Sequence, residues 1–297
     1  MRVFVTGASG WIGSAVTAEL TARGHRITGL ARSDESAAAI TAAGATPLRG
    51  SLDDLASLRA GAENADGVVH LGFKHDFSDM ATSGVTERAA LETMLEVLEG
   101  SDRPFLFASG IAGLTPGRPV TEEDANPNEA PDSMRGGGER LALSYAERGV
   151  RSVALRFAPT VHGEGDHGFV AAIARVATST GRSGYVGDGA NRWPAIHRQD
   201  AAKLVALALE GSPAGSIVHA VGEEGITTRE IAEALGAALG VPAVSISAEE
   251  AAASLGFIGR IFSLDTPASS TLTQQRLGWT PTQQGLLADI AAGYYTP

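Results

Sequence analysis

Three glycines near the amino terminus are the residues whose type and spacing most clearly permit chemistry. Gly7, Gly10 and Gly13 follow an apolar run at residues 2–6 and directly precede a helix-like pattern. Glycine lets the backbone turn tightly and approach a phosphate closely, and a helix starting there aims its first N–H groups at an anion. The spacing differs from the usual Gly-x-Gly-x-x-Gly. The strand before it and the helix after it nevertheless predict a site for a dinucleotide pyrophosphate.

The end of the second predicted strand indicates which dinucleotide is bound. An acidic residue there would bind the ribose 2′-hydroxyl of NAD, but Ala31 occupies this position and Arg32 and Ser33 follow it. A guanidinium beside a hydroxyl suits the 2′-phosphate of NADP. We therefore expect NADP(H), and NAD(H) remains the alternative because Asp34 lies close to the same position.

Two side chains further along have the chemistry that a reaction at a carbonyl group needs. Ser109 ends the fifth predicted strand, at the edge where open α/β sheets bind ligands, and its hydroxyl could polarise a carbonyl. His162 lies in the glycine-rich segment 161–168, and imidazole has a pKa near neutrality that suits a proton donor. The same segment contains His167 and two acids, but their spacing matches no helical i, i+4 ligand pair. We expect no metal there.

The elements that must position these residues alternate along the first half of the chain. Strand-like segments lie near residues 2–6, 26–31, 46–49, 66–71, 104–108 and 151–156, and helix-like segments near 12–23, 34–43, 53–60, 81–99 and 134–148. This alternation predicts right-handed βαβ crossovers and a doubly wound parallel sheet, the α/β Rossmann architecture. Residues 114–133 are rich in Pro, Asn, Glu and Asp and predict a loop.

After about residue 160 the pattern changes, because glycines interrupt residues 162–192. Helical patterns return near residues 169–179, 199–210, 227–239 and 284–292. We expect a nucleotide-binding core over residues 1–160 and a smaller, mostly substrate-binding lobe over 161–297, with 195–220 returning to the core.

Composition limits the partners. The chain has 297 residues, a formal net charge of −11 and no cysteine. An acidic surface disfavours nucleic acid and anionic membranes, and the lack of cysteine excludes disulfides and thiolate sites. The sequence has no apolar run of about 18 residues and no basic, apolar leader at its start. We expect a cytoplasmic protein with a small-molecule substrate, and leave a homodimer open.

Five sequence blocks together resemble the extended or atypical branch of the short-chain dehydrogenase/reductase family, which is epimerase/dehydratase-like. The blocks are residues 6–13 (similar to TGxxGxxG), 70–73 (an HLA-type strand end), 106–110, 155–163 (similar to LRPxxVYG) and 196–200 (similar to IHVxD). Their order and spacing agree with the family from residue 1 to about residue 205. The resemblance implies a Rossmann fold, an NAD(P) cofactor and oxidoreductase chemistry, and says less about the reaction itself.

The resemblance also implies positions around the cofactor and the substrate. Besides Arg32 and Ser33, the implied cofactor positions are Thr6, Gly7, Ser9, Gly10, Trp11, Ile12, Gly13, Leu52, Leu71, Gly72, Arg135 and Pro159. Asp53, next to Leu52, is expected to cap the following helix. Residues 184–194 resemble the loop that closes over substrate, which makes Tyr185 a third catalytic candidate and places Asn191, Arg192 and Trp193 nearby.

The sequence departs from the family at its usual Tyr-x-x-x-Lys pair. The two lysines, Lys74 and Lys203, have no tyrosine four residues before them. Matching Glu139 to the glutamate that usually follows the pair puts Arg135 at the lysine position and Pro131 at the tyrosine position. Arginine can hold ribose hydroxyls but is a poor general acid, and proline offers none. The proton donor is then expected to be His162, Tyr185 or water.

Three functions therefore stay open. The first is an NADP(H)-dependent oxidoreductase acting on a small carbonyl or alcohol. The second is an NAD-dependent nucleotide-sugar epimerase or dehydratase, and the third is a dinucleotide sensor without catalysis. The glycines at 136–138 also allow two interpretations. Either the helix starts late, or a cofactor or a neighbouring helix approaches the backbone closely there.

Overall fold

The computed structural model describes residues 1–74, 79–114, 118–127, 130–131, 133 and 137–296. The chain forms two compact units: unit 1 consists of residues 1–109, 125–156 and 202–218, and unit 2 of residues 110–124, 157–201 and 219–297. The sequence expected 110–124 to lie in the core. In the structure this segment belongs to unit 2, where the Val120 N–H donates to the carbonyl of Pro267.

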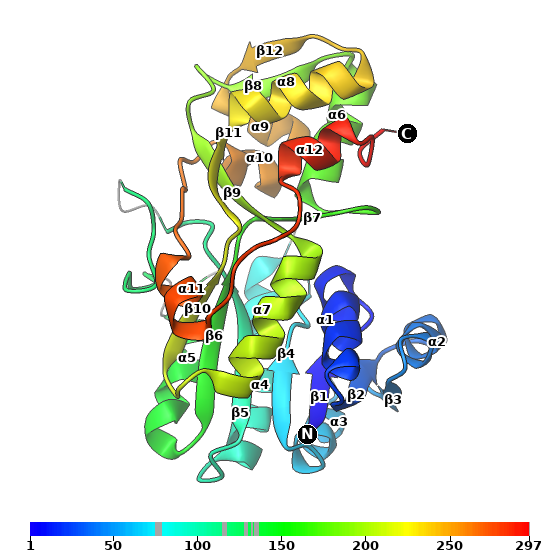
Figure 1. Ribbon diagram of the computed structural model, residues 1–297, viewed down its shortest axis with the longest axis vertical. Coiled ribbons are helices and arrows are strands. Elements are labelled where there is room, and N and C mark those ends of the chain that lie inside the picture. Colours follow the sequence, from blue (N-terminus) through cyan, green and yellow to red (C-terminus); the bar gives the residue numbers. More distant parts are fainter. Residues whose placement is uncertain (75–78, 115–117, 128–129, 132, 134–136, 297) are drawn as a thin grey trace. The chain divides into compact units, whose positions relative to one another are not determined.

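The central sheet has seven strands in the order β10-β6-β5-β4-β1-β2-β3 (Figure 1). The strands are β1 (Arg2–Thr6), β2 (Arg26–Ala31), β3 (Thr46–Arg49), β4 (Gly67–His70), β5 (Pro104–Gly110), β6 (Arg151–Phe157) and β10 (Ser216–Ala220). Strand β1 runs parallel to both β2 and β4, so that Val5 lies between Gly29 and Val69. The order reverses at β1, which creates the switch point where doubly wound sheets bind ligands. The Rossmann sheet expected from the sequence is confirmed.

Helices cover both faces of this sheet. They are α1 (Trp11–Ala22), α2 (Asp34–Ala42), α3 (Leu55–Glu63), α4 (Met80–Leu98), α5 (Gly138–Ser144) and α7 (Arg198–Gly211), with a 3₁₀ turn at Tyr145–Arg148. In Figure 1, α1 and α7 lie in front of the sheet and α4 and α5 behind it. Large apolar side chains fill the space between the sheet and α3, α4 and α5, among them Phe4, Leu58, Leu91, Met94, Phe105 and Phe107. Their burial is the main stabilising contribution in unit 1.

Side-chain caps explain where three of these helices begin. The side chains of Ser33, Asp54 and Asp79 accept hydrogen bonds from the first turns of α2, α3 and α4, and each such cap contributes about 1 kcal/mol. The residue that caps α3 is Asp54, so the cap expected at Asp53 was wrong by one position. Helix α1 differs, because its N-cap is Gly10 and it has no side-chain cap.

Unit 2 is built from small sheets and short helices. Strands β7 (Thr160–His162), β9 (Arg192–His197) and β11 (Glu223–Thr227) form one sheet, and β8 (Ser183–Val186) pairs with β12 (Ala243–Ile246). The helices are α6 (Phe169–Thr180), α8 (Thr228–Leu239), α9 (Ala248–Leu255), α10 (Phe257–Phe262), α11 (Thr271–Leu277) and α12 (Leu286–Ala291). The buried Trp193 ring packs between Phe169 and Phe262, with centroid distances of 6.2 and 4.9 Å. Trp193 therefore belongs to the core of this unit.

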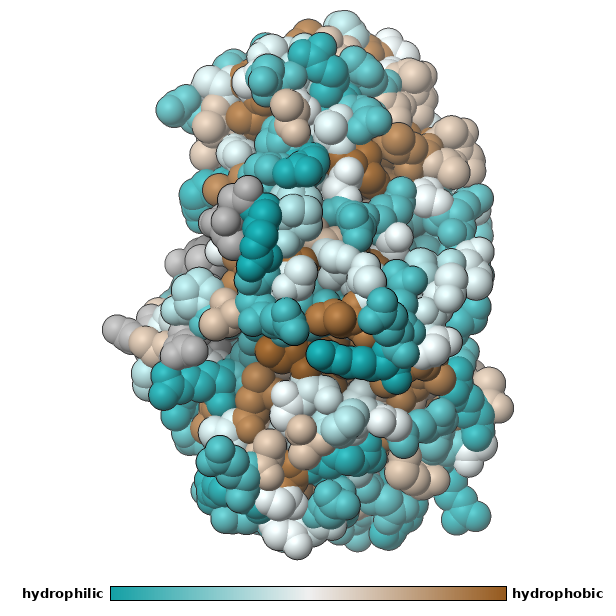
Figure 2. All heavy atoms as spheres, turned by 60° about the vertical axis from the view of Figure 1, so that its left-hand side comes forward, coloured by the Kyte–Doolittle hydropathy of each residue, from teal (hydrophilic) through white to brown (hydrophobic). Residues whose placement is uncertain are grey.

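The surface carries few exposed large hydrophobic side chains. Within the described part of the chain these are Met1, Leu55, Val85 and Leu264. Hydrophilic residues occupy much of the face drawn in Figure 2, with hydrophobic ones in separate areas between them. None of the helices built from described residues has the length and apolar character needed to cross a bilayer.

Candidate dinucleotide site

The glycine turn after β1 leaves no room for side chains at two of its three glycines. Gly7 has φ +68°, and a Cβ there would lie 2.8 Å from the backbone nitrogen of Gly72. A Cβ at Gly13 would lie 1.9 Å from the carbonyl oxygen of Gly7, inside any tolerable contact. The Gly10 N–H donates to the same carbonyl at 2.9 Å and closes the turn.

The start of helix α1 has the properties of an anion site. Its N-cap is Gly10, an exposed residue without a side chain to accept from the first turn. The first N–H groups of a helix have no intrahelical partners, and the helix dipole places partial positive charge there. Ser9 is exposed in the same turn, and Trp11 and Ile12 are partly exposed in the first turn of α1. The turn and the helix start together fit a pyrophosphate.

The end of β4 is held against this turn by a side-chain network. The Thr6 hydroxyl accepts from the Gly72 N–H at 3.0 Å and lies 2.8 Å from Nδ1 of His70. The buried His70 ring stacks on Phe105 and Phe107. Thr6 and His70 thus hold Leu71 and Gly72 beside the glycine turn, where the sequence placed part of the cofactor site.

The end of β2 carries the charge expected for a phosphate. Arg32 is exposed and makes no hydrogen bond or ion pair with any described residue. Ser33 is partly committed elsewhere, because its hydroxyl accepts from the Ser36 N–H at 3.2 Å and caps α2. Asp34, the alternative ligand for the NAD ribose, forms an ion pair of 2.8 Å with Arg49.

The residues after β3 border the same region. Leu52 is partly buried, and its Cδ2 would lie 3.3 Å from a Cβ on Gly72. Asp53 does not cap a helix but forms an ion pair of 2.5 Å with Lys74, which follows β4. Leu52 therefore lies beside the end of β4, and the Asp53–Lys74 pair joins the segments after β3 and β4.

Ser109 belongs to a charged, hydrogen-bonding cluster of unit 1. Its partner is Glu139 at the start of α5, which also receives an Asn126 hydrogen bond and a 2.6 Å ion pair from the fully buried Arg156. Burial raises the pKa of Glu139, but Arg156, Ser109 and Asn126 outweigh it and hold that pKa below its ordinary value. An ionised carboxylate only accepts hydrogen bonds, so toward Glu139 Ser109 can act only as a donor. Ser109 as a donor to a substrate carbonyl stays a prediction.

His162 lies in a buried, charged cluster of unit 2. Its Nδ1 is 2.5 Å from Asp289 on α12, and its Nε2 is 3.5 Å from Glu223 on β11. Burial lowers the pKa of His162, but the carboxylates of Glu223 and Asp289 outweigh it and raise that pKa. The ring is fully buried, so its proton is shared with carboxylates rather than exposed. His162 as a proton donor stays a prediction.

His197 is a polar residue of this cluster to which sequence reasoning assigned no role. Its ring lies edge-on to His162 with a centroid distance of 5.4 Å. Burial and the charge of His162 lower the pKa of His197. The Gln199 N–H donates to Nδ1 of His197 at 3.2 Å, so the neutral ring carries its proton on Nε2. The sequence contained His197 only as part of a family motif.

The segment expected to close over substrate is engaged within unit 2. The Arg229 guanidinium lies 4.6 Å from the centroid of the Tyr185 ring on β8. Asn191 donates to the Phe262 carbonyl at 2.7 Å, and Arg192 forms a 2.9 Å ion pair with Asp265. Asn191 and Arg192 thus hold their own unit together, and the partly exposed Tyr185 stays a prediction as a catalytic residue.

The remaining candidate residues are distributed as follows. Ser109 belongs to unit 1, whereas His162, Tyr185 and Pro159 belong to unit 2. Arg135 lies outside the described residues, and Pro131 is exposed.

Gly137 and Gly138, at the start of α5, test the two interpretations of the run at 136–138. Helix α5 begins late, after Gly137 in the left-handed conformation (φ +62°). A Cβ on Gly138 would also lie 2.9 Å from the Phe107 ring and 3.0 Å from Leu91. The late start and the close packing on a neighbouring helix therefore both hold.

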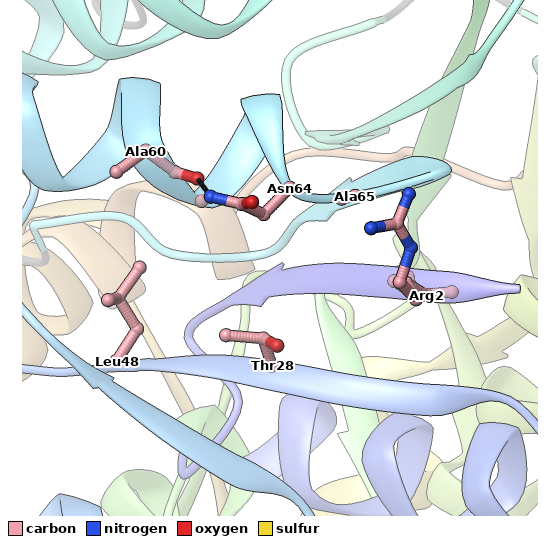
Figure 3. Close-up of a pocket in the computed structure, with 8 residues that line it drawn as sticks. Arg2, Thr28, Leu48, Ala60, Asn64 and Ala65 are labelled. Atoms are coloured by element: carbon pink, nitrogen blue, oxygen red, sulfur yellow. Dashed lines mark hydrogen bonds between the residues drawn. The ribbon is translucent and has the colours of Figure 1, made fainter.

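A separate hollow lies at the opposite edge of the sheet, where β1 begins (Figure 3). Arg2, Thr28, Leu48, Ala60, Asn64 and Ala65 are among the residues that line it. Two of its polar side chains already have partners, since Arg2 pairs with Asp66 at 2.7 Å and Asn64 donates to Ala60. This hollow offers little to recognise a ligand.

A doubly wound sheet whose first strand leads through a glycine turn into an uncapped helix defines a Rossmann protein of the NAD(P)-binding class. A sequence profile of the NAD dependent epimerase/dehydratase family matches residues 3–220, and the chain belongs to this family. The family expected from the sequence blocks is confirmed.

Individual relatives extend over most of the chain. The uncharacterized protein C2A9.02 of Schizosaccharomyces pombe is 47% identical over 296 residues, which cover 99% of this chain and 100% of that protein. The 2′-dehydrokanamycin reductase of Streptomyces kanamyceticus is 31% identical, covering 86% of this chain and 72% of the reductase. A solved structure of a DesIV double mutant, a dTDP-glucose 4,6-dehydratase from Streptomyces venezuelae with NAD bound, has a TM-score of 0.78 at 20% identity and covers 99% and 96% of the two chains. This structural similarity shows that the two chains share a fold.

Proposed function

We propose that this protein is an NADP(H)-dependent oxidoreductase that acts on a small carbonyl or alcohol substrate. The observation that carries the cofactor choice is Arg32, an exposed and unengaged guanidinium directly after Ala31, the position at which an NAD-selective protein has an acid. Asp34, the nearest acid, is paired with Arg49. A guanidinium binds a 2′-phosphate through charge-assisted hydrogen bonds that NAD cannot offer.

The relatives support the reaction class. The Streptomyces kanamyceticus relative is named as a reductase, and it matches 86% of this chain. When bound, the nicotinamide supplies hydride chemistry. The chain's own residues would hold the pyrophosphate at the glycine turn, and the Ser109 hydroxyl would polarise the substrate carbonyl. The proton donor is His162, Tyr185 or water, in that order of preference.

A second function, an NAD-dependent epimerase or dehydratase, is favoured by the family and by its dTDP-glucose 4,6-dehydratase neighbour. Such an enzyme would retain its dinucleotide through transient oxidation. Mass spectrometry of the purified protein checks this directly, because co-purified NAD supports the second function and its absence supports the first.

A sensor without catalysis is the third candidate, since no tyrosine precedes a lysine by four residues.

Calorimetry tests the proposed cofactor. The wild type should bind NADPH more tightly than NADH, and Arg32→Ala should weaken NADPH by about 1–3 kcal/mol while leaving NADH nearly unchanged. Equal affinity of the wild type for the two nucleotides would contradict the proposal.

A panel of aldehydes and ketones with NADPH tests the reaction. Turnover supports the reductase, and tight NADPH binding without any turnover supports the sensor. The pH–rate profile then separates the proton donors. A His162 acid lowers the rate as pH rises through its pKa, which is raised above the ordinary value near 6.5, whereas Tyr185 or water leaves the rate flat to about pH 9.

A further inference from the structure

Two arginines come from neighbouring strand ends at the adenosine side of the candidate site. Arg49 ends β3 and lies in register beside Ala31, the last residue of β2, and Arg32 follows Ala31 directly. Neighbouring strands lie about 4.8 Å apart, so the two backbones approach closely at this edge. Both side chains are exposed.

The present partner of Arg49 is Asp34, the first residue of α2. The Arg49 Nη2 lies 2.8 Å from Asp34 Oδ1, and the Asp34 side chain is fully exposed. An exposed ion pair of this kind contributes little and is easily exchanged for a stronger contact. A phosphate dianion is such a contact, because it carries more charge than a carboxylate and accepts from a guanidinium through two oxygens.

We propose that Arg49 is a second determinant of cofactor choice, which exchanges Asp34 for the 2′-phosphate of NADP(H) and completes a two-arginine site with Arg32. The inference rests on the proposed NADP(H) preference. With NADP(H) bound, Arg49 attracts the phosphate; without it, Arg49 occupies the carboxylate of Asp34, which could otherwise accept from the 2′-hydroxyl of NAD. Removing Arg49 should therefore weaken NADPH and leave NADH unchanged or slightly tighter.

Calorimetry with NADPH, NADH and 2′,5′-ADP tests this proposal on the folded protein. The last probe contains the 2′-phosphate without the nicotinamide half. Arg49→Ala should lose at least tenfold in affinity for NADPH and for 2′,5′-ADP. Asp34→Asn should tighten both several-fold, and the double variant Asp34→Asn/Arg49→Ala should lose less than Arg49→Ala alone, because the repelling carboxylate is gone.

Arg26→Ala is the matched control. Arg26 begins the same strand, β2, at the opposite edge of the sheet, and its removal changes the net charge equally. This variant should bind all three probes as the wild type does. Thermal unfolding of every variant checks that the fold is retained.

The outcomes separate this inference from the proposed function. If Arg32→Ala weakens NADPH while Arg49→Ala behaves like Arg26→Ala, Arg49 is no determinant and the proposed cofactor stands. If the wild type does not prefer NADPH over NADH, the cofactor proposal fails and this inference fails with it. A tenfold loss confined to NADPH and 2′,5′-ADP supports both.

Discussion

A neighbouring carboxylate gives Ser109 a structural role beside its predicted chemical one. Taken alone, a serine at the carboxyl edge of a parallel sheet suggests a donor to a substrate carbonyl. In the structure Ser109 also interacts with Glu139, a buried carboxylate that Arg156 holds in an ion pair, and helps to keep the pKa of Glu139 low. The sequence contained Glu139 and Arg156, but nothing in their spacing showed that they meet Ser109. Contacts between residues far apart in sequence depend on packing, which local patterns do not encode.

Ser109→Ala should therefore act on stability before chemistry. Removing one donor from the buried Glu139 carboxylate should lower the free energy of unfolding by about 1–3 kcal/mol. Urea unfolding measures this effect, and Ser144→Ala serves as the control, because Ser144 is an exposed serine of α5 that donates to a helix carbonyl. A variant with wild-type stability and a tenfold loss of turnover would instead make Ser109 a catalytic donor.

The charged cluster around His162 should make stability depend on pH. Its folded-state pKa is raised above the ordinary value near 6.5, so its contribution is fully present below about pH 6.5 and is lost as pH rises through the folded pKa. Neighbouring His197 and Asp166 also titrate, with pKa values lowered and raised. Comparison with a variant isolates the part that belongs to His162.

Urea unfolding from pH 6 to 9 provides the measurement. The wild type should lose stability over this range relative to Glu223→Gln, which keeps an acceptor for the Leu286 N–H but removes the charge 3.5 Å from His162. His162→Gln should remove the part of the pH dependence of stability that Glu223→Gln leaves in place. Parallel pH curves for all three proteins would mean that His162 carries no buried charge.

At the scale of elements, the sequence predicted best where pattern and turn chemistry agree. The strands and helices of the first half lie within about four residues of their expected bounds, because apolar runs and glycine turns alternate there. Helix α5 starts at Gly138 rather than near residue 134, because Gly137 is left-handed. The short α9, α10 and α11 were not predicted, since six to eight residues show too little periodicity.

The candidate site follows the same division. The glycine turn is local, so its residues could be predicted from their spacing. The Asp34–Arg49 pair depends on the pairing of β2 with β3, and the His162–Asp289 contact joins residues 127 positions apart. Neither could be derived from local sequence.

The glycine turn allows a prediction that separates binding from folding. Gly10 has ordinary extended backbone angles, and the nearest atom to an added Cβ lies 3.2 Å away. Gly10→Val should therefore fold but lose NADPH binding, because its side chain occupies the path of the pyrophosphate. Gly13→Ala should unfold instead, since its Cβ would lie 1.9 Å from the Gly7 carbonyl oxygen.

Calorimetry and thermal unfolding of the two variants check this contrast. Unchanged NADPH affinity in a folded Gly10→Val protein would mean that the site lies elsewhere. A folded Gly13→Ala protein with wild-type stability would mean that the turn is looser than its geometry indicates.

At the scale of the whole molecule, the two units share continuous elements. The chain passes from one unit to the other inside β5, β6, α7 and β10. Hydrogen-bonded strands and helices of this kind do not divide easily, unlike the exposed linkers that usually join independent domains. We therefore expect the units to unfold together, although all residues of the glycine turn belong to unit 1.

Tryptophan fluorescence can test that coupling, because the three tryptophans are unequally distributed. Trp11 belongs to unit 1, and the buried Trp193 and Trp279 belong to unit 2. In a Trp11→Phe variant the fluorescence reports unit 2 alone. NADPH at 100 times its Kd should stabilise the folded state by about 2.7 kcal/mol. With coupled units, that gain should raise the unfolding midpoint equally by fluorescence and by far-UV circular dichroism. A fluorescence transition that NADPH leaves in place, beside a circular dichroism transition that it shifts, would mean that unit 2 unfolds on its own.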